Sequence, residues 1–223
     1  MQGDGLFLAL AGVSAAAAVV YGLFFLNRAP SWPRALVKTA FMAALAAAFI
    51  SRGSHPFLII ALAASAAGDF FLAFDKKWVL PFGILSFLTA QLAYLVIFFF
   101  MWMFSGDNAP LWPRYAAMGL VIAAASACVL WLLPKLKWMA LAVVPYAVAI
   151  TGMGAMAMWL PWSGWPAMLG AALFLTSDFV LAAEPFRLAP DAPARRYTVP
   201  IVWWTYVAAQ ALIVFGIVRI VSG

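Results

Sequence analysis

The stretch "YLVIFFF", residues 94–100, lies inside an apolar run that extends over about 78–104. A helix needs roughly 17 to 25 apolar residues to cross a bilayer, and this run is long enough. Its apolar residues do not alternate with polar ones, which disfavours a strand of a membrane β-barrel. Lipid also offers the backbone no hydrogen-bond partners, which favours a helix. The stretch therefore predicts a transmembrane helix.

Seven further runs have the same character, and short breaks rich in charge and proline separate them. The eight predicted transmembrane helices cover about 5–26, 34–50, 56–74, 78–104, 113–133, 138–160, 165–184 and 198–221. The first run begins just after Met1 without a basic segment before it, so we interpret it as a helix and not as a cleaved signal peptide. The fold class is all-α, a polytopic membrane protein with a single membrane-embedded domain over 1–223.

The composition supports this class. Hydrophobic residues make up 68% of the 223 residues and charged residues only 9%, with a mean hydropathy of +1.04. A soluble domain is nearer half apolar and a quarter charged. The single Cys128 excludes an internal disulfide, and the single His55, in a loop, cannot supply a zinc ligand set. We expect no metal and no other cofactor, and no nucleic-acid partner.

The net charge of +6 is informative about orientation. Ten of the 13 basic residues fall on the side that holds the loops after the first, third, fifth and seventh helices, and three fall on the other. The positive-inside rule then predicts both termini outside the cytoplasm, as for a protein of the bacterial inner membrane. The ten are Arg28, Arg34, Lys38, Lys76, Lys77, Lys135, Lys137, Arg187, Arg195 and Arg196, and the three are Arg52, Arg114 and Arg219.

Two segments of the chain resemble each other. "SAAGDFFLA" (65–73) aligns with "FLTSDFVLA" (174–182), and "TAQLAYLVIF" (89–98) with "AAQALIVFGI" (208–217). The offset is four helices, so the direction through the membrane is kept. The pattern predicts two parallel four-helix repeat halves, 1–104 and 113–223.

Each repeated segment holds one aspartate, Asp69 or Asp178, near the predicted C-terminal end of its helix. Both carboxylates are therefore expected at similar depth, in the cytoplasmic half of the membrane. A carboxylate there is costly and usually faces the bundle interior or a water-filled cavity, which makes the pair a candidate functional site. A structural pair satisfied by Ser65, Ser177 or a nearby Tyr or Gln is an open alternative, as is a solvated Asp69 at the interface.

Other polar residues stand at helical spacing within the runs. Gln91 and Tyr94 share one face, and so do Tyr206 and Gln210. Tyr146 follows Pro145, a residue that frees a backbone carbonyl in its helix. For Lys38, near the start of the second helix, the sequence alone favours a side chain that extends to the interface.

Five motifs in series resemble the YhhN family of integral membrane proteins: "ASAAGDFFL", "GILSFLTAQLAY", "PYAVAITGMGAMA", "GAALFLTSDFVLA" and "WWTYVAAQALIVFG". The resemblance covers about 38–215. It implies an eight-helix lysoplasmalogenase acting on a lysophospholipid in the bilayer, with Asp69 and Asp178 catalytic. It also implies a pocket that includes Lys38, Tyr146, Tyr206 and Gln210.

The resemblance is incomplete at one position. Gln91 and Tyr94 stand where many members have His-x-x-Tyr, and a glutamine can hydrogen-bond but cannot titrate. We expect both residues to bind the substrate, with the difference affecting substrate preference more than fold.

The implied chemistry suits a pair of carboxyl groups. Acid opens a vinyl ether through an oxocarbenium ion, and glycosidases handle a related cation with one protonated and one ionised carboxyl group. Asp69 and Asp178 are the predicted pair, and the reaction needs no metal.

Three other functions remain open at this stage. A transporter for a small molecule or lipid is one, because parallel repeats around a polar site also occur in transporters. An intramembrane aspartyl protease is disfavoured, because Ala66 stands where its Gly-x-Gly-Asp motif needs glycine, and Ser177 where its Tyr-Asp motif needs tyrosine. A purely structural protein would leave the paired aspartates unexplained.

Overall fold

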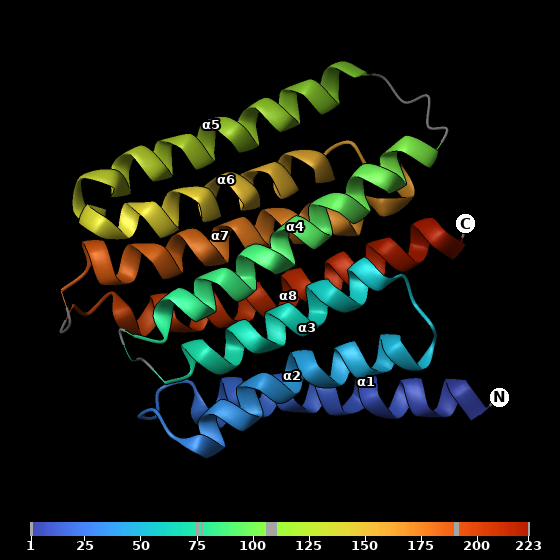
Figure 1. Cartoon of the computed structure of the whole chain (residues 1–223), viewed down its shortest axis with the longest axis horizontal. Coiled ribbons are helices and arrows are strands. Elements are labelled where there is room, and N and C mark those ends of the chain that lie inside the picture. The colour runs from blue at the N-terminus through green and yellow to red at the C-terminus, as the bar shows by residue number, and fades with distance from the viewer. Residues whose placement is uncertain (1, 75, 77, 106–110, 190–191, 223) are drawn as a thin grey trace. The chain divides into compact units, whose positions relative to one another are not determined.

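The computed structural model describes residues 2–74, 76, 78–105, 111–189 and 192–222, and within them every regular element is helical (Figure 1). The α-helices coincide with the predicted apolar runs to within a few residues. They are α1 (Gln2–Val20), α2 (Trp32–Ser51), α3 (Pro56–Leu72), α4 (Leu80–Phe104), α5 (Leu111–Leu136), α6 (Ala140–Ala157), α7 (Trp165–Arg187) and α8 (Arg195–Ser222). Three short elements adjoin them: the π-helical turn η1 (Tyr21–Phe25) and the 3-10 turns η2 (Lys137–Met139) and η3 (Trp162–Gly164).

Six helical stretches among the described residues are long and apolar enough to cross a membrane. Two features explain why this number is lower than the eight predicted spans. Helix α3 has only 17 residues, about 25 Å of helix, which is the lower limit for a span. Helices α5 and α6 fall within one apolar stretch, Leu111–Ala157.

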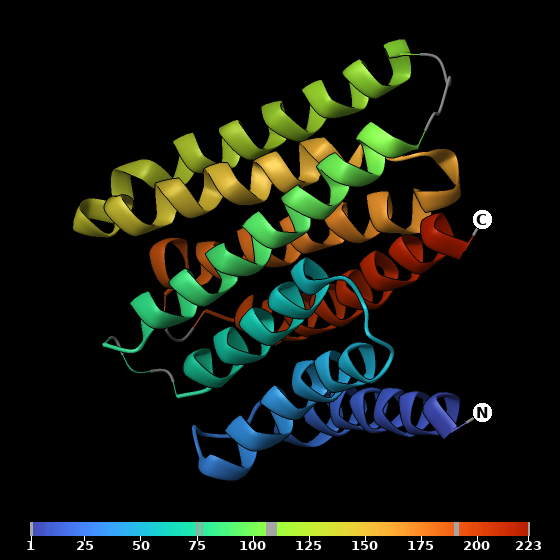
Figure 2. The same ribbon diagram turned by 45° about the vertical axis from the view of Figure 1, so that its right-hand side comes forward.

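The stretch Leu111–Ala157 is nevertheless not one straight rod. The backbone of Lys137 has φ +49°, a left-handed conformation that ends a right-handed helix. Helices α5 and α6 pack against each other, and Figures 1 and 2 show them side by side and antiparallel. The stretch is therefore a helical hairpin.

The chain forms two compact units, 1–94 and 95–223, with their boundary inside α4. In the N-terminal unit α2 packs against both α1 and α3. The start of α4 lies against α3 at two glycines: a Cβ on Gly68 would stand 2.5 Å from the ring of Phe87, and one on Gly83 would stand 2.5 Å from Leu72. The two glycines thus leave room for the side chains of Phe87 and Leu72 between α3 and α4.

In the C-terminal unit α7 and α8 make the most extensive contact, and α6 packs against α5 and α7. The backbones of α7 and α8 approach each other at two glycines. A Cβ on Gly216 would lie 2.4 Å from the backbone nitrogen of Ala167, and one on Gly170 would lie 2.8 Å from the carbonyl oxygen of Ala209. Neither helix can therefore carry a larger residue at these crossings.

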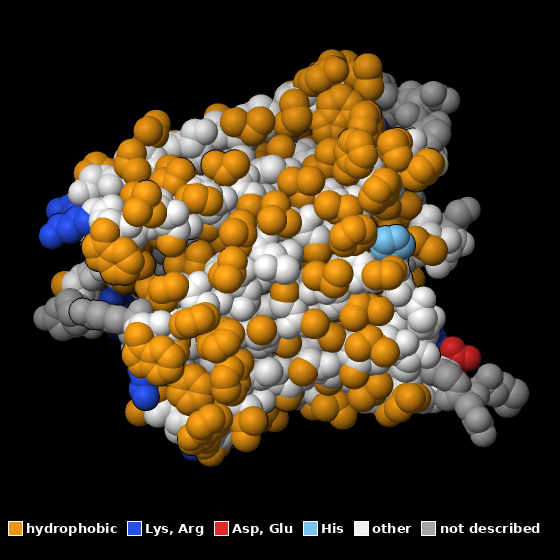
Figure 3. Space-filling model, viewed as in Figure 1, with side chains coloured by type: hydrophobic (Ala, Val, Ile, Leu, Met, Phe, Trp, Pro, Cys, Tyr) orange, Lys and Arg blue, Asp and Glu red, His pale blue; other side chains and the backbone are white. Residues whose placement is uncertain are grey.

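Figure 3 shows one face of the molecule with hydrophobic side chains spread over it. Large side chains that a soluble protein would bury are exposed here, such as Leu141 (85%), Phe104 (77%) and Trp162 (75%). Lipid is the solvent in which such a surface is stable, so the chain is a helical membrane protein. Of the residues used above to predict orientation, Lys77 lies outside the described residues.

Candidate functional site

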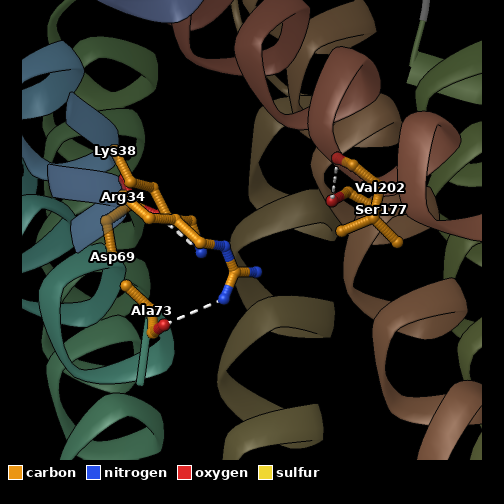
Figure 4. Close-up of polar contacts among 6 residues, drawn as sticks. All are labelled: Arg34, Lys38, Asp69, Ala73, Ser177 and Val202. Atoms are coloured by element: carbon orange, nitrogen blue, oxygen red, sulfur yellow. Dashed lines mark hydrogen bonds and ion pairs between the residues drawn. The ribbon is translucent and has the colours of Figure 1, made fainter. Parts of the chain in front are cut away.

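Asp69 lies in the last turn of α3 and is almost completely buried. Its side chain is 2% exposed, and its Oδ1 atom lies 3.6 Å from Nζ of Lys38, which comes from α2 (Figure 4). Because a buried carboxylate needs a compensating partner, this ion pair explains how Asp69 is accommodated. The alternative of a solvated, interfacial Asp69 is therefore wrong.

The prediction that Lys38 extends to the interface is also wrong. Its side chain is only 16% exposed, because the nearby carboxylate holds the ammonium group inside the unit. A lysine side chain extends to water where no buried anion attracts its ammonium group. Lys38 therefore pairs with Asp69, and its predicted role in a substrate pocket stays a prediction.

Arg34 adds a second cation to the same end of α3. It stands four residues before Lys38 on α2, and its Nη1 donates to the carbonyl oxygen of Ala73, the C-cap of α3, at 2.9 Å (Figure 4). The last carbonyls of a helix carry partial negative charge and lack partners within the helix, so an arginine stabilises them. The start of α2 is itself fixed by Ser31, whose side chain accepts a hydrogen bond from the backbone of Arg34.

Asp178 lies in α7 and is partly buried. Its Oδ2 atom accepts a hydrogen bond from the hydroxyl of Tyr146, which comes from α6 just after Pro145. Both side chains line a small cavity of about 30 Å³, with room for roughly two water molecules. The rest of its lining is apolar: Val129, Leu132 and Leu136 of α5, Val143, Ala147 and Ile150 of α6, and Phe179 and Ala182 of α7.

The two aspartates differ in their distance from the helix end. Asp69 is three residues from the end of α3, as predicted, whereas α7 continues through Pro185 to Arg187 and leaves Asp178 nine residues from its end. A proline near a helix end breaks few hydrogen bonds, so the helix need not stop before it. The prediction that both aspartates stand near helix ends is thus confirmed for Asp69 and wrong for Asp178.

Three further polar residues of the C-terminal unit, one on α7 and two on α8, are buried. Ser177 donates its hydroxyl to the carbonyl oxygen of Val202 at 2.9 Å, so that hydroxyl bridges α7 and α8 (Figure 4). Tyr206 is 5% exposed and meets the ring of Phe174 edge to face, with centroids 5.5 Å apart. Gln210, one turn further along α8, is completely buried.

Gln91 and Tyr94, on α4 in the N-terminal unit, are both completely buried. Their predicted common face is thus the interior face of α4. Neither polar atom of the Gln91 amide has a hydrogen-bond partner among the described residues. An unpaired buried amide costs about 1–3 kcal/mol, so this position is unusual for a residue with only a packing role.

No group of three or more His, Cys, Asp or Glu side chains within the described ranges is arranged to hold a metal ion. The single histidine, His55, has a structural role: its side chain accepts a hydrogen bond from the backbone of Phe57 and caps the N-terminus of α3.

The sequence profile of the YhhN family matches residues 33–217, which include both aspartate sites. The chain belongs to the YhhN family. Two proteins named lysoplasmalogenase, from Mycobacterium bovis and Mycobacterium tuberculosis, are each 32% identical over 194 residues, covering 82% of this chain and 70% of theirs. A protein named lysoplasmalogenase TMEM86A, from Bos taurus, is 28% identical over 222 residues, covering 92% of this chain and 86% of its own. No solved structure shows a significant match.

Among the predicted site residues, the structure of this YhhN protein brings together Lys38 with Asp69 and Tyr146 with Asp178. Each combination lies within one unit. Arg34 was not predicted as part of a site, although its spacing of four residues from Lys38 would have placed both cations on one face of α2.

Proposed function

We propose that this YhhN protein is a lysoplasmalogenase, a membrane hydrolase that cleaves the vinyl ether of a lysoplasmalogen to a fatty aldehyde and a glycerophospho-base. The observation that supports this most directly is the pair of aspartates inside the helical units, each with a polar partner from a neighbouring helix. The names of the relatives give the substrate class.

The proposed reaction divides the work between a protonated and an ionised carboxyl group. A proton from one aspartate goes to the β-carbon of the vinyl ether and leaves an oxocarbenium ion on the other vinyl carbon. The second aspartate, as carboxylate, stabilises this cation and accepts a proton from the water that adds to it. The hemiacetal then breaks its bond to the glycerol oxygen. This oxygen takes the proton that the second aspartate gained, while the hemiacetal hydroxyl gives its proton to the first aspartate as the aldehyde forms, so both aspartates return to their starting states.

The partners of each aspartate fit these roles. An ammonium 3.6 Å from Asp69 stabilises a negative charge on its carboxylate. The phenol of Tyr146 fixes the orientation of one Asp178 oxygen beside a cavity that is otherwise apolar. We further propose that the remaining polar residues bind the substrate, Lys38 through the lipid phosphate and the others through hydrogen bonds: Gln91, Tyr94, Tyr146, Tyr206 and Gln210.

Metal independence and the eight-span arrangement in two parallel halves, with both termini outside the cytoplasm, are parts of the same proposal. The excess of basic residues in and beside the connections after α1, α3, α5 and α7 supports this orientation. Single cysteines placed at Asp4 and at Arg195, in a variant with Cys128 replaced by alanine, test it with a membrane-impermeant thiol reagent. Position 4 should react from the outside and position 195 only after the membrane is opened. Labelling of position 195 in intact cells would reverse the orientation. The predicted outer position of Gly223 lies outside the described residues.

The activity itself is tested with purified protein in detergent and lysoplasmenyl-ethanolamine, measuring free aldehyde. The control lipid is the saturated alkyl ether of the same chain length, which cannot form the cation by protonation of a double bond. Release of aldehyde from the vinyl ether alone supports the proposal. If no aldehyde forms but the lipid crosses vesicle membranes that contain the protein, the transporter is the correct function.

A further inference from the structure

The small cavity of the C-terminal unit has one polar side. Helices α5, α6 and α7 pack against one another around it, and eight of its ten lining residues are apolar. The other two are Asp178 and Tyr146, which share a hydrogen bond. No basic side chain lies among the ten. Because burial against apolar groups penalises a charge, this lining favours a neutral carboxyl group over a carboxylate.

Asp69 has the opposite surroundings. The ammonium of Lys38 lies 3.6 Å from its Oδ1 atom, in a place where both side chains are largely buried. A cation at this distance favours the carboxylate over the neutral form. The two aspartates therefore differ in the way that is required of a proton donor and an ionised partner in one reaction.

The size of the cavity matches the reactive part of the proposed substrate. Its volume of about 30 Å³ holds roughly two groups of the size of a water molecule. The two carbons of a vinyl group are of this size, and they are apolar, as most of the lining is. The glycerophospho-base is larger and charged, so it does not fit.

We infer that this cavity receives the vinyl group of the substrate and that Asp178 is the acid that protonates it. The inference rests on the proposed function. The proton of the Asp178 carboxyl group moves to the β-carbon, and the π electron pair of the double bond forms the new C–H bond. The other vinyl carbon becomes the oxocarbenium carbon, and Asp178 is left as a carboxylate until the hemiacetal returns a proton to it. The ionised partner is then Asp69.

The hydrogen bond from Tyr146 suits an acid that becomes charged during the reaction. It reaches Oδ2 of Asp178, and a hydrogen bond to a carboxylate is stronger than one to a neutral carboxyl group. The phenol therefore stabilises the state after proton transfer more than the state before it. Only such differential interactions accelerate a chemical step.

The proton donor can be identified from the product formed in D₂O. The β-carbon of a vinyl-ether lysolipid becomes a CHD centre, and reduction of the aldehyde to the alcohol as it forms preserves its configuration. A carboxyl group fixed beside the double bond delivers deuterium to one face, whereas uncatalysed protonation uses both. The native protein and the slower Asp69→Asn variant should give one configuration, measured by NMR of a chiral ester. The residual product of Asp178→Asn should contain both configurations.

Two results overturn the assignment of the acid. Both configurations from Asp69→Asn, or a single configuration from Asp178→Asn, would show that Asp178 does not supply the proton. If Asp178→Asn keeps one configuration and Asp69→Asn loses it, the roles of the two aspartates are reversed.

The place of the vinyl group is tested by filling the cavity. Ala147→Val adds two carbons to the lining, so turnover per folded molecule should fall about 10²-fold, the scale for a substrate misplaced by about 1 Å, while the unfolding temperature stays the same or rises. Ala182→Val fills the same space from α7. The control is Val148→Leu, which enlarges a side chain of α6 that is 67% exposed and should leave both values unchanged. Native turnover in Ala147→Val or Ala182→Val would overturn the cavity site.

A binding measurement separates this inference from the proposed function. The vinyl-ether lysolipid should raise the unfolding temperature of the native protein in detergent and raise it less in Ala147→Val. Equal rises in the two proteins would overturn the cavity site. If the native protein makes no aldehyde yet shows this difference, the cavity binds the lipid and the lysoplasmalogenase proposal fails.

Discussion

In the N-terminal unit the carboxylate of Asp69 lies beside an ammonium group, whereas in the C-terminal unit the carboxylate of Asp178 accepts a hydrogen bond from a phenol. The two aspartates come from segments that resemble each other in sequence, yet the neighbouring helix supplies a different partner in each case. Asp69 is also more deeply buried and closer to its helix end. The comparison teaches that a repeated motif fixes neither the distance of its aspartate from the helix end nor the chemical group that the neighbouring helix supplies.

The strongest test of this comparison is the removal of each charge in turn. Asp69→Asn and Asp178→Asn keep the size of the side chain and remove proton transfer, so each should lower turnover by about 10²–10⁴. The double variant should be little worse, because groups that act as a unit are not additive. Activity per folded molecule, with folding checked by size-exclusion chromatography, is the measurement. Near-native turnover in either folded variant would remove that aspartate from the reaction.

Loss of the ion pair between Lys38 and Asp69 should lower the stability of the protein. Lys38→Met removes one partner of a buried ion pair, which typically costs about 3–5 kcal/mol. The matched control is Arg52→Met, which breaks the exposed pair with Asp4 and should cost at most about 1 kcal/mol. Thermal unfolding in one detergent compares the two variants directly. Equal shifts of the unfolding temperature in the two variants would mean that burial of the Lys38–Asp69 pair adds nothing to its contribution to stability.

Loss of the hydrogen bond between Tyr146 and Asp178 should mainly lower kcat. Tyr146→Phe removes one hydrogen bond to Asp178 and keeps the ring. A hydrogen bond to a charged group is typically worth about 1.5–3 kcal/mol. The lower end of this range corresponds to a fall in kcat of about tenfold, which is the effect we expect. Stability should change less than in Lys38→Met. A variant with native kcat would show that the phenol does not orient the carboxylate during the reaction.

The smallest expected effect is that of chelators. Both sites are built from carboxylates and their partners, so EDTA and phenanthroline should leave the rate of aldehyde release unchanged. The measurement is the rate before and after dialysis against each chelator. Loss of activity that added metal restores would replace the two-carboxylate mechanism.

The helices could be predicted from the sequence because lipid makes the length of an apolar run nearly sufficient to define a helix. Asp69 and Asp178 could be found for the same reason, since a carboxylate is conspicuous in such a run. Their partners could not, because Tyr146 and Asp178 are 32 residues apart and meet only through the packing of α6 on α7. Whether Lys38 extends outward or turns inward also depends on the neighbouring helix and not on its own segment.

One helix end and one buried amide show the limits of local signals. The apolar run predicted over 165–184 stops before Pro185, yet α7 continues past this proline to Arg187. The unpaired amide of Gln91 has no sequence signal at all, because a glutamine in an apolar run looks the same whether or not a partner faces it. Such features depend on three-dimensional packing.

The turn at Lys137 has a consequence for the biosynthesis of the chain. Only the three residues Lys137–Met139 separate α5 from α6, and the left-handed backbone of Lys137 reverses the chain between them. We expect the two helices to enter the membrane as one hairpin, because so short a connection keeps them together.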